Sequence, residues 1–83
     1  MSTIDEIKVF LKERGYTIIE NVDIDSPIKL IGIRSAHIYL LRIKEGRLSL
    51  SEKLKLEGEM PKSDERYVTS LVLDDNWKTW LGD

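Results

Sequence analysis

Apolar residues near the N-terminus recur at intervals of three and four, which is the repeat of a helix with one buried face. Thr3 and Glu6 have the spacing of a capping box, in which two side chains satisfy free backbone groups at a helix start. Gly15 follows a basic residue and suits the left-handed position that ends a helix. The pattern therefore predicts a helix over residues 3–14. Its apolar stripe consists of Ile4, Ile7, Phe10 and Leu11.

β-Branched and aromatic residues dominate the next part of the chain, with turn residues between the groups, and this composition is typical of strands. Pro27 pushes Ser26 toward an extended conformation, so we expect a loop over residues 23–27. Another turn is expected at Glu45 and Gly46, and a loop at 60–65. Four strands are predicted, over 16–22, 28–34, 37–44 and 67–73.

Residues 47–57 fit two patterns. Ser49 and Glu52 again have capping-box spacing, and Gly58 would stop a helix that begins there. The leucines of the same segment alternate with polar residues, which is the pattern of a strand. We favour a short strand at 47–49 followed by a helix to about residue 57, and the strand alternative stays open. The leucines concerned are Leu48, Leu50, Leu54 and Leu56.

These elements predict an α+β fold in a single domain, residues 1–83. The order is helix, three strands, helix, strand, and a short helical turn over 75–81. The chain has no cysteine, which excludes disulfides and thiolate sites. It also lacks the basic start and apolar middle of a signal peptide and any apolar run long enough to cross a membrane. We therefore expect a cytoplasmic protein, and the absence of glutamine leans toward a thermophile.

The formal net charge of −2 is unusual for a domain that coats nucleic acid. The acids are concentrated after residue 44, while the first half of the chain is nearly neutral. A local cationic face therefore remains possible on an acidic protein.

Few residues of this sequence suggest chemistry. His37 is the sole histidine, and we expect it in the turn between the second and third strands, as a surface residue and not as a general base. The acidic pairs lack the further oxygen ligands of a calcium loop, so loop solvation or helix capping is expected for them. These pairs are Asp23 with Asp25 and Asp74 with Asp75. No metal site, catalytic residue or cofactor is expected.

Two tryptophans close the chain at helical spacing. Trp77 and Trp80 would share one side of a helical turn, with Leu81 beside them. They would either close the core or form an exposed anchor for a protein partner or a second copy, because aromatic residues are enriched at interface centres. We predict a protein interface at these three residues and keep the core role as the alternative.

Several segments together resemble the archaeal Holliday junction resolvases and the wider PD-(D/E)xK nuclease superfamily. Gly15-Tyr16 matches the glycine–aromatic pair that leads to the first strand, and residues 29–33 match the second strand. Arg42-Ile43-Lys44 ends the third strand where the family has an acid, an apolar residue and a lysine. Glu52 lies near the family's polar helix residue, and residues 67–73 match the final core strand.

The resemblance implies a nuclease fold that cannot cut. The family uses two carboxylates to hold Mg²⁺ against the scissile phosphate. Lys29 and Arg42 stand in those two places here, so a divalent cation would be repelled, and Lys44 alone cannot replace it.

Two functions follow as expectations. The first is a non-catalytic module that binds protein, as a homodimer or as an accessory subunit of a DNA-processing assembly. The alternative is nucleic-acid binding without cleavage, through a cationic sheet face that would hold phosphate directly. Against the alternative, the cations could equally form a solvated face with Arg42 paired to an acid. The cations of the alternative are Lys29, Arg34, Arg42 and Lys44.

Overall fold

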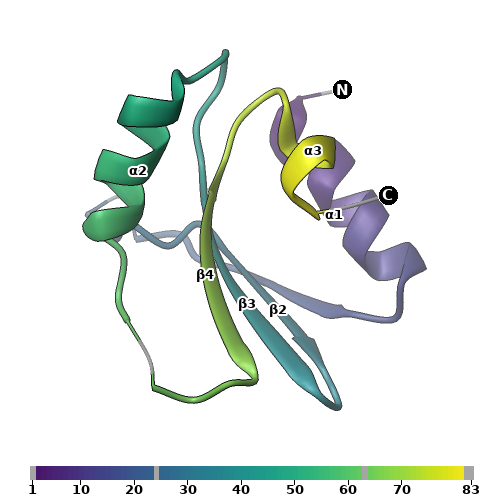
Figure 1. The fold of residues 1–83 in the computed structure, drawn as a ribbon. Helices are drawn as coiled ribbons and strands as arrows, with labels where there is room; N and C mark the ends of the chain where they lie inside the picture. The colour runs from purple at the N-terminus through teal and green to yellow at the C-terminus, as the bar shows by residue number, and fades with distance from the viewer. Residues whose placement is uncertain (1, 24, 63, 82–83) are drawn as a thin grey trace.

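The computed structural model describes residues 2–23, 25–62 and 64–81. Within these described residues, three helices and four strands follow one another in the predicted order (Figure 1). Positions 24 and 63 of the two predicted loops lie outside the described residues. The elements are α1 (Thr3–Glu13), β1 (Thr17–Glu20), β2 (Leu30–Arg34), β3 (His37–Ile43), α2 (Leu50–Gly58), β4 (Val68–Leu73) and α3 (Trp77–Leu81).

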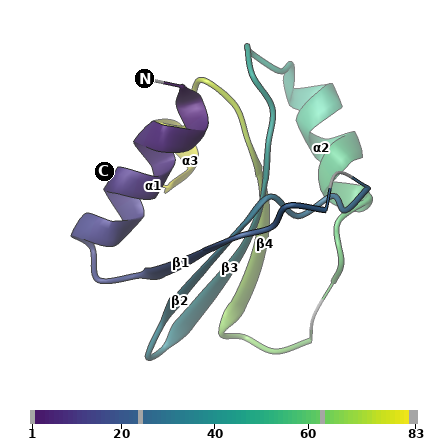
Figure 2. The same cartoon turned by 180° about the vertical axis from the view of Figure 1, so that it is seen from behind.

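The strands form one mixed sheet in the order β1-β2-β3-β4. β1, β2 and β3 are antiparallel neighbours. β4 runs parallel to β3, because the connection through α2 returns the chain to the end of the sheet at which β3 begins. Figures 1 and 2 show α1 and α3 together on one face of the sheet and α2 on the opposite face. The α+β class and the predicted order of elements are confirmed.

The start of α1 differs from the expectation by one residue. Ser2, not Thr3, is the N-cap, and its hydroxyl accepts the backbone N–H of Asp5 at 3.3 Å. Thr3 is instead buried, and its hydroxyl donates to the Asp75 carboxylate near α3. Gly15 has a φ of +88°, so the predicted left-handed turn after the helix is confirmed.

The ambiguous segment forms a helix. Ser49 and Glu52 make the complete capping box, with each side chain bonded to the backbone of the other residue, and α2 begins directly after it. The predicted short strand at 47–49 does not form. The backbone N–H of Leu48 instead donates to the buried carboxylate of Asp74.

Alternation along the strands separates two apolar layers. The main core lies between the sheet and α1, and Trp77 closes it from α3. Val72 and Met60 are buried on the α2 side. The residues of the main core are Ile7, Leu11, Tyr16, Leu30, Leu41, Leu73 and Trp77. Within the described part of the chain, no helix is long and apolar enough to cross a membrane.

Candidate functional site

The four predicted cations do not share one face. Leu30 pairs with Leu41, so Lys29 lies beside Arg42 at the end of the antiparallel pair. Arg42 and Lys44 have the strand parity of the α2 side. Arg34 has the opposite parity and lies at the other end of β2. The structure therefore brings Lys29, Arg42 and Lys44 to one end of the sheet and leaves Arg34 away from them.

The cations near α2 are accompanied by acids. Arg42 Nη1 lies 3.3 Å from Glu59 Oε1, which is the pairing that the solvated-face interpretation expected. Lys44 lines a shallow cavity of about 280 Å³ together with residues of both charges from α2, including Glu52 and Lys55. This mixture of charges is poorly suited to a phosphate, which prefers uncompensated cations.

Arg34 holds the end of α1. Its Nη1 donates to the backbone carbonyl of Arg14 at 2.9 Å, and its guanidinium lies 4.8 Å from the centre of the Tyr16 ring. A cation at the C-terminus of a helix satisfies a free carbonyl and complements the helix dipole. The contact of Arg34 with the end of α1 is therefore structural.

His37 is not a turn residue, which corrects the sequence prediction. The turn consists of Ser35 and Ala36, and His37 is the first residue of β3. Its side chain is half-buried, with Nε2 at 2.8 Å from Thr69 Oγ1 and Nδ1 at 3.2 Å from the Tyr16 hydroxyl. The ring thus links β3 to β4 and to the turn after α1. Burial, and then the neighbouring Tyr16, raise the pKa of Tyr39 above its ordinary value in the same cluster.

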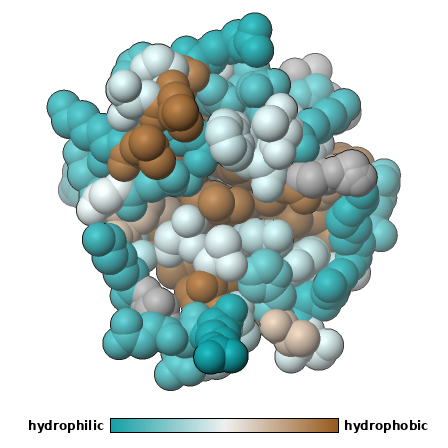
Figure 3. Space-filling view, viewed as in Figure 1, coloured by the Kyte–Doolittle hydropathy of each residue, from teal (hydrophilic) through white to brown (hydrophobic). Residues whose placement is uncertain are grey.

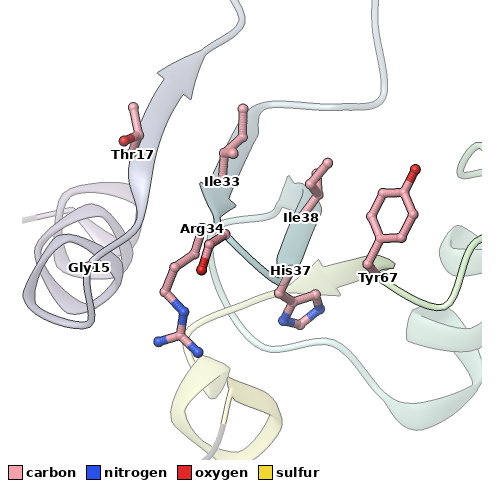
Figure 4. Close-up of a pocket in the computed structure, with 8 residues that line it drawn as sticks. Gly15, Thr17, Ile33, Arg34, His37, Ile38 and Tyr67 are labelled. Atoms are coloured by element: carbon pink, nitrogen blue, oxygen red, sulfur yellow. The ribbon is translucent and has the colours of Figure 1, made fainter.

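The same end of the sheet carries a second, shallow cavity of about 640 Å³. Figure 4 shows Thr17, Ile33, Ile38 and Tyr67 pointing toward one side of the sheet, whereas Arg34 and His37 point toward the other. The cavity therefore follows the rim of the sheet, and its apolar and polar lining residues do not converge on one point. Such an arrangement has no group of polar atoms aimed at a common ligand.

The two tryptophans have different roles. Trp77 is 4% exposed and packs edge-on against Phe10, with 5.0 Å between ring centres. Trp77 thus has the core role that was kept as the alternative, and its burial leaves little ring surface for a partner. Trp80 is 41% exposed, and Leu81 is half-buried against the core. Of the predicted interface, Trp80 is the residue that a partner can reach.

Helix α2 buries a lysine against the rest of the protein and exposes two leucines to solvent. Lys53 is 6% exposed, its Nζ lies 2.5 Å from Glu57 Oε2, and it also lies 4.2 Å from the centre of the Trp80 ring. Leu50 and Leu54, one helical turn apart, are 62% and 59% exposed. We call these two residues the leucine stripe. A buried lysine beside an exposed apolar pair is the reverse of the usual distribution.

Contacts on either side of α2 show where the leucine stripe lies. Glu59 reaches inward over the sheet to Arg42 of β3. Glu57 instead contacts the backbone N–H of Val72 in β4, with 3.4 Å between Oε2 and N. The leucine stripe lies on the Glu57 side of the helix, because residues 50, 54 and 57 follow one another at helical spacing. The stripe therefore overhangs the outer edge of β4.

β4 is an edge strand whose outer side is partly covered by other segments of the chain. The N–H of Ile38 donates to the carbonyl of Tyr67 at 2.7 Å, and the N–H of Lys44 donates to that of Leu73 at 2.9 Å. The backbone N–H and C=O groups of the odd-numbered residues of β4 therefore point toward β3, and those of the even-numbered residues point away from it. These outer residues are Val68, Ser70 and Val72. The Val68 N–H donates to the carbonyl of Glu65 at 3.2 Å, and Val72 is buried with its N–H near Glu57.

We give the name α2–β4 surface to the leucine stripe, to Trp80, which contacts Lys53 of the same helix, and to the partly exposed Val68 and Ser70 of β4. Figure 3 looks onto the β4 edge and shows apolar surface on α2 and again across the middle of the molecule. Apart from the spacing of Leu50 and Leu54, no pattern in the sequence indicated this surface. Which side of a helix is buried depends on contacts with distant residues.

No known relative helps to assign a function. Among the residues that the structure describes, no three or more histidine, aspartate or glutamate side chains are grouped so that they could hold a metal ion. The chain matches no known family model, and no curated protein and no solved structure matches it significantly.

Proposed function

We propose that this chain is a non-catalytic module that binds protein through the α2–β4 surface. The observation that carries the proposal is the orientation of α2, which buries Lys53 and exposes Leu50 and Leu54. Exposed apolar residues scattered singly are ordinary, but here two exposed leucines lie one helical turn apart on the helix whose Lys53 contacts the partly exposed Trp80. Aromatic and apolar side chains at such a site are typical of the central part of a protein interface.

We also propose that the module derives from the nuclease fold that its sequence resembles. An antiparallel β1-β2-β3 unit followed by a helix and a parallel β4 supports this relation, since the resemblance implied the same order. In the two places where the family has carboxylates, Lys29 and Arg42 lie side by side. Two adjacent cations oppose Mg²⁺ binding, which supports a role without cleavage, for example as a subunit of a DNA-processing assembly.

The first experiment places a photo-crosslinking amino acid at position 54 and, as a control, at position 22. Val22 is highly exposed but lies outside the α2–β4 surface. Irradiation in a lysate of the source organism is expected to give a discrete adduct at position 54 alone. Excess wild-type protein should compete with the adduct, whereas a Leu50→Glu, Leu54→Glu variant should not. Equal labelling at both positions would refute the proposal.

A second experiment tests the nucleic-acid alternative. Fluorescence anisotropy with labelled duplex and four-way-junction DNA is measured at low and near-physiological salt, with Mg²⁺ present. We expect no binding that depends on Lys29 and Arg42, because Arg42 is paired with Glu59 and the net charge is negative. Salt-sensitive binding that Lys29→Glu plus Arg42→Glu abolishes would replace the protein-binding proposal with the alternative.

A further inference from the structure

We infer that two copies of this chain associate face to face through the side of the sheet that α1 does not cover. The interface is formed by six side chains of β1, β2 and β3, which we call the open sheet face. This inference goes beyond the proposed function, because the leucine stripe lies on the outer side of β4 and stays free to bind a different protein. The residues of the open sheet face are Thr17, Ile19, Ile31, Ile33, Ile38 and Leu40.

The direction of Gly32 in β2 shows which side chains form this face. A Cβ atom at Gly32 would lie 3.5 Å from the Tyr16 side chain and 3.6 Å from that of Leu11, so this position faces α1. Ile31 and Ile33 therefore point to the opposite side of the sheet, because neighbouring side chains in a strand alternate. The register adds residues of β1 and β3 that lie directly beside them. The two cross-strand rows are Ile19 with Ile31 and Leu40, and Thr17 with Ile33 and Ile38.

The open sheet face lacks the polar side chains of a solvated sheet. When one side of an antiparallel sheet faces water, the residues on that side are usually polar. Here five of the six residues are isoleucine or leucine, and none is charged. Ile19 is nevertheless 48% exposed and Ile33 38% exposed. β2 and β3 thus have the composition of strands that are covered on both sides, which indicates that a further layer packs here.

Among the helices of the described chain, α2 covers part of this side of the sheet. Figures 1 and 2 show α1 and α3 on the opposite side and α2 beside β4. Glu59, directly after α2, reaches Arg42 near the end of β3, and Val72 of β4 is fully buried. The exposure of Ile19 and Ile33 shows that β1 and β2 lie outside this cover. The side opposite α1 therefore has a covered part over β4 and a bare part beside it.

The step between these two parts fits a second copy of the same chain. Stacked sheets lie about 10 Å apart, and an α-helix is about 10 Å thick, so a second sheet on the bare part would lie in the same layer as α2. A two-fold axis above β2, parallel to the strands, places β2 on β2 of the second copy and β1 on β3 of the second copy. Each α2 then lies beside the β1 edge of the other copy and does not collide with its sheet. A chain with one covered and one bare part is thus complementary to itself.

This axis matches apolar residues with apolar residues. Ile33 would face Ile33 of the second copy, and Ile19 would face Leu40 of the second copy. The uncharged centre therefore meets itself without repulsion. Charged residues of α2, including Glu52 and Lys55, would fall at the rim, where interfaces are usually polar.

The contact has the area of a small specific interface. Three strands about 4.8 Å apart and about 20 Å long give a flat area of roughly 300 Å². One side of the nine-residue α2 and the β1 edge of each copy add roughly 200 Å². Side-chain relief raises this figure toward the value of about 600 Å² that the smaller specific interfaces cover on each partner. We therefore expect a reversible dimer with a dissociation constant in the micromolar range.

Sedimentation velocity of the purified chain, up to millimolar concentration, tests this dimer. Wild type is expected to show a monomer–dimer equilibrium, which Ile33→Glu should weaken about tenfold or more, because each copy would bury an unpaired carboxylate. Val9→Glu is the matched control, since Val9 has a similar exposure of 44% but lies on α1. Ile33→Thr keeps the β-branched shape and should weaken the dimer even if Ile33→Glu does not fold. Circular dichroism checks that each variant is folded.

The absence of cysteine from the chain allows a second readout. The thiol of Ile33→Cys would lie opposite its counterpart across the two-fold axis, so a short bifunctional maleimide should link two such chains. Val9→Cys, on α1, and Leu54→Cys, on the leucine stripe, should stay largely unlinked at the same concentration. Equal cross-linking at all three positions would refute the inferred interface.

The outcomes separate this inference from the proposed function. A wild type that stays monomeric at millimolar concentration would refute the dimer, while a competed adduct at position 54 would still support the binding surface. A dimer that Leu50→Glu with Leu54→Glu dissociates, but Ile33→Thr does not, would overturn the inference and place self-association at the α2–β4 surface. A dimer that both Ile33 variants dissociate, without a specific adduct at position 54, would support the inference and refute the proposed function.

Discussion

The buried carboxylate of Asp74 joins the segment before α2 to the segment that begins α3. Asp74 is 4% exposed, Oδ2 accepts the N–H of Leu48 at 2.7 Å, and Oδ1 accepts the N–H of Asn76 at 2.8 Å. Each carboxylate oxygen thus serves a different donor. An amide has a single acceptor oxygen, so Asp74→Asn must lose one of these bonds, whichever way the amide is turned.

The expected loss of stability follows from these two bonds. A hydrogen bond to a charged group contributes about 1.5–3 kcal/mol. Asp74→Asn removes one such bond, makes the other neutral, and turns an NH₂ group toward a backbone N–H. We therefore expect a loss of about 2–4 kcal/mol, against a total of roughly 4–12 kcal/mol at 0.05–0.15 kcal/mol per residue. With a urea m value of about 1 kcal/mol per M, the midpoint would fall by about 2 M or more.

Urea unfolding followed by tryptophan fluorescence measures this change, because both tryptophans lie in α3. Asp75→Asn is the matched control. The Asp75 carboxylate accepts from the Thr3 hydroxyl, and an amide oxygen can do the same, so a loss below about 1 kcal/mol is expected. Equal midpoints for the two variants would refute the assignment of a structural role to Asp74.

Four further substitutions test other parts of the structure. Trp77→Ala should lower the free energy of unfolding by about 3–5 kcal/mol, as for other buried tryptophans. Trp80→Ala should lower it by about 1 kcal/mol or less, since the Trp80 ring is partly exposed. Equal losses for the two variants in urea unfolding would contradict the burial of Trp77. His37→Ala should cost about 1–3 kcal/mol through two lost hydrogen bonds, and an unchanged midpoint would contradict them. The bond from Lys8 to Glu20, 2.6 Å between Nζ and Oε2, lowers the pKa of Glu20 below 4.5. The stabilisation by this ion pair is therefore present above the ordinary pKa of a glutamate and is lost as the pH falls through the lowered pKa of Glu20. NMR titration should show the pKa of Glu20 rising in Lys8→Met, and no change would refute the pairing.

Local patterns predicted most of the elements but extended all four strands, β1 and β2 by more than one residue. Tyr16 was expected in β1, yet its N–H donates to the carbonyl of Leu11, and its ring belongs to the core under α1. It is thus part of the turn that ends the helix. β2 likewise starts at Leu30 and not at residue 28, because Ile28 bonds locally through the Ser26 and Asn21 side chains. Such side-chain bonds compete with strand pairing and have no periodic signature.

The candidate site was harder to predict because burial there depends on residues far apart in sequence. Trp77 and Trp80 have equivalent spacing and composition, and only packing against Phe10 and Lys53 distinguishes them. His37 was expected in the turn although the predicted third strand, 37–44, began at this residue, because its position beside the turn indicated a surface residue. Its ring instead meets Thr69 of a strand more than thirty residues away, which no local pattern could indicate.

The orientation of α2 is costly for an isolated molecule, and this cost is the strongest argument for a partner. Full burial of a leucine side chain contributes about 1.5–3 kcal/mol. Leu50 and Leu54 are more than half exposed, so most of this stabilisation is absent for both. The buried pair of Lys53 and Glu57 does not compensate, because a buried ion pair is seldom better than apolar packing. A helix turned by one residue, about 100°, would bury Leu54 in place of Lys53. The capping box at Ser49 and the contacts of Glu57 and Trp80 hold α2 against that rotation. The apolar surface is therefore maintained by specific contacts, as expected if its burial takes place in a complex.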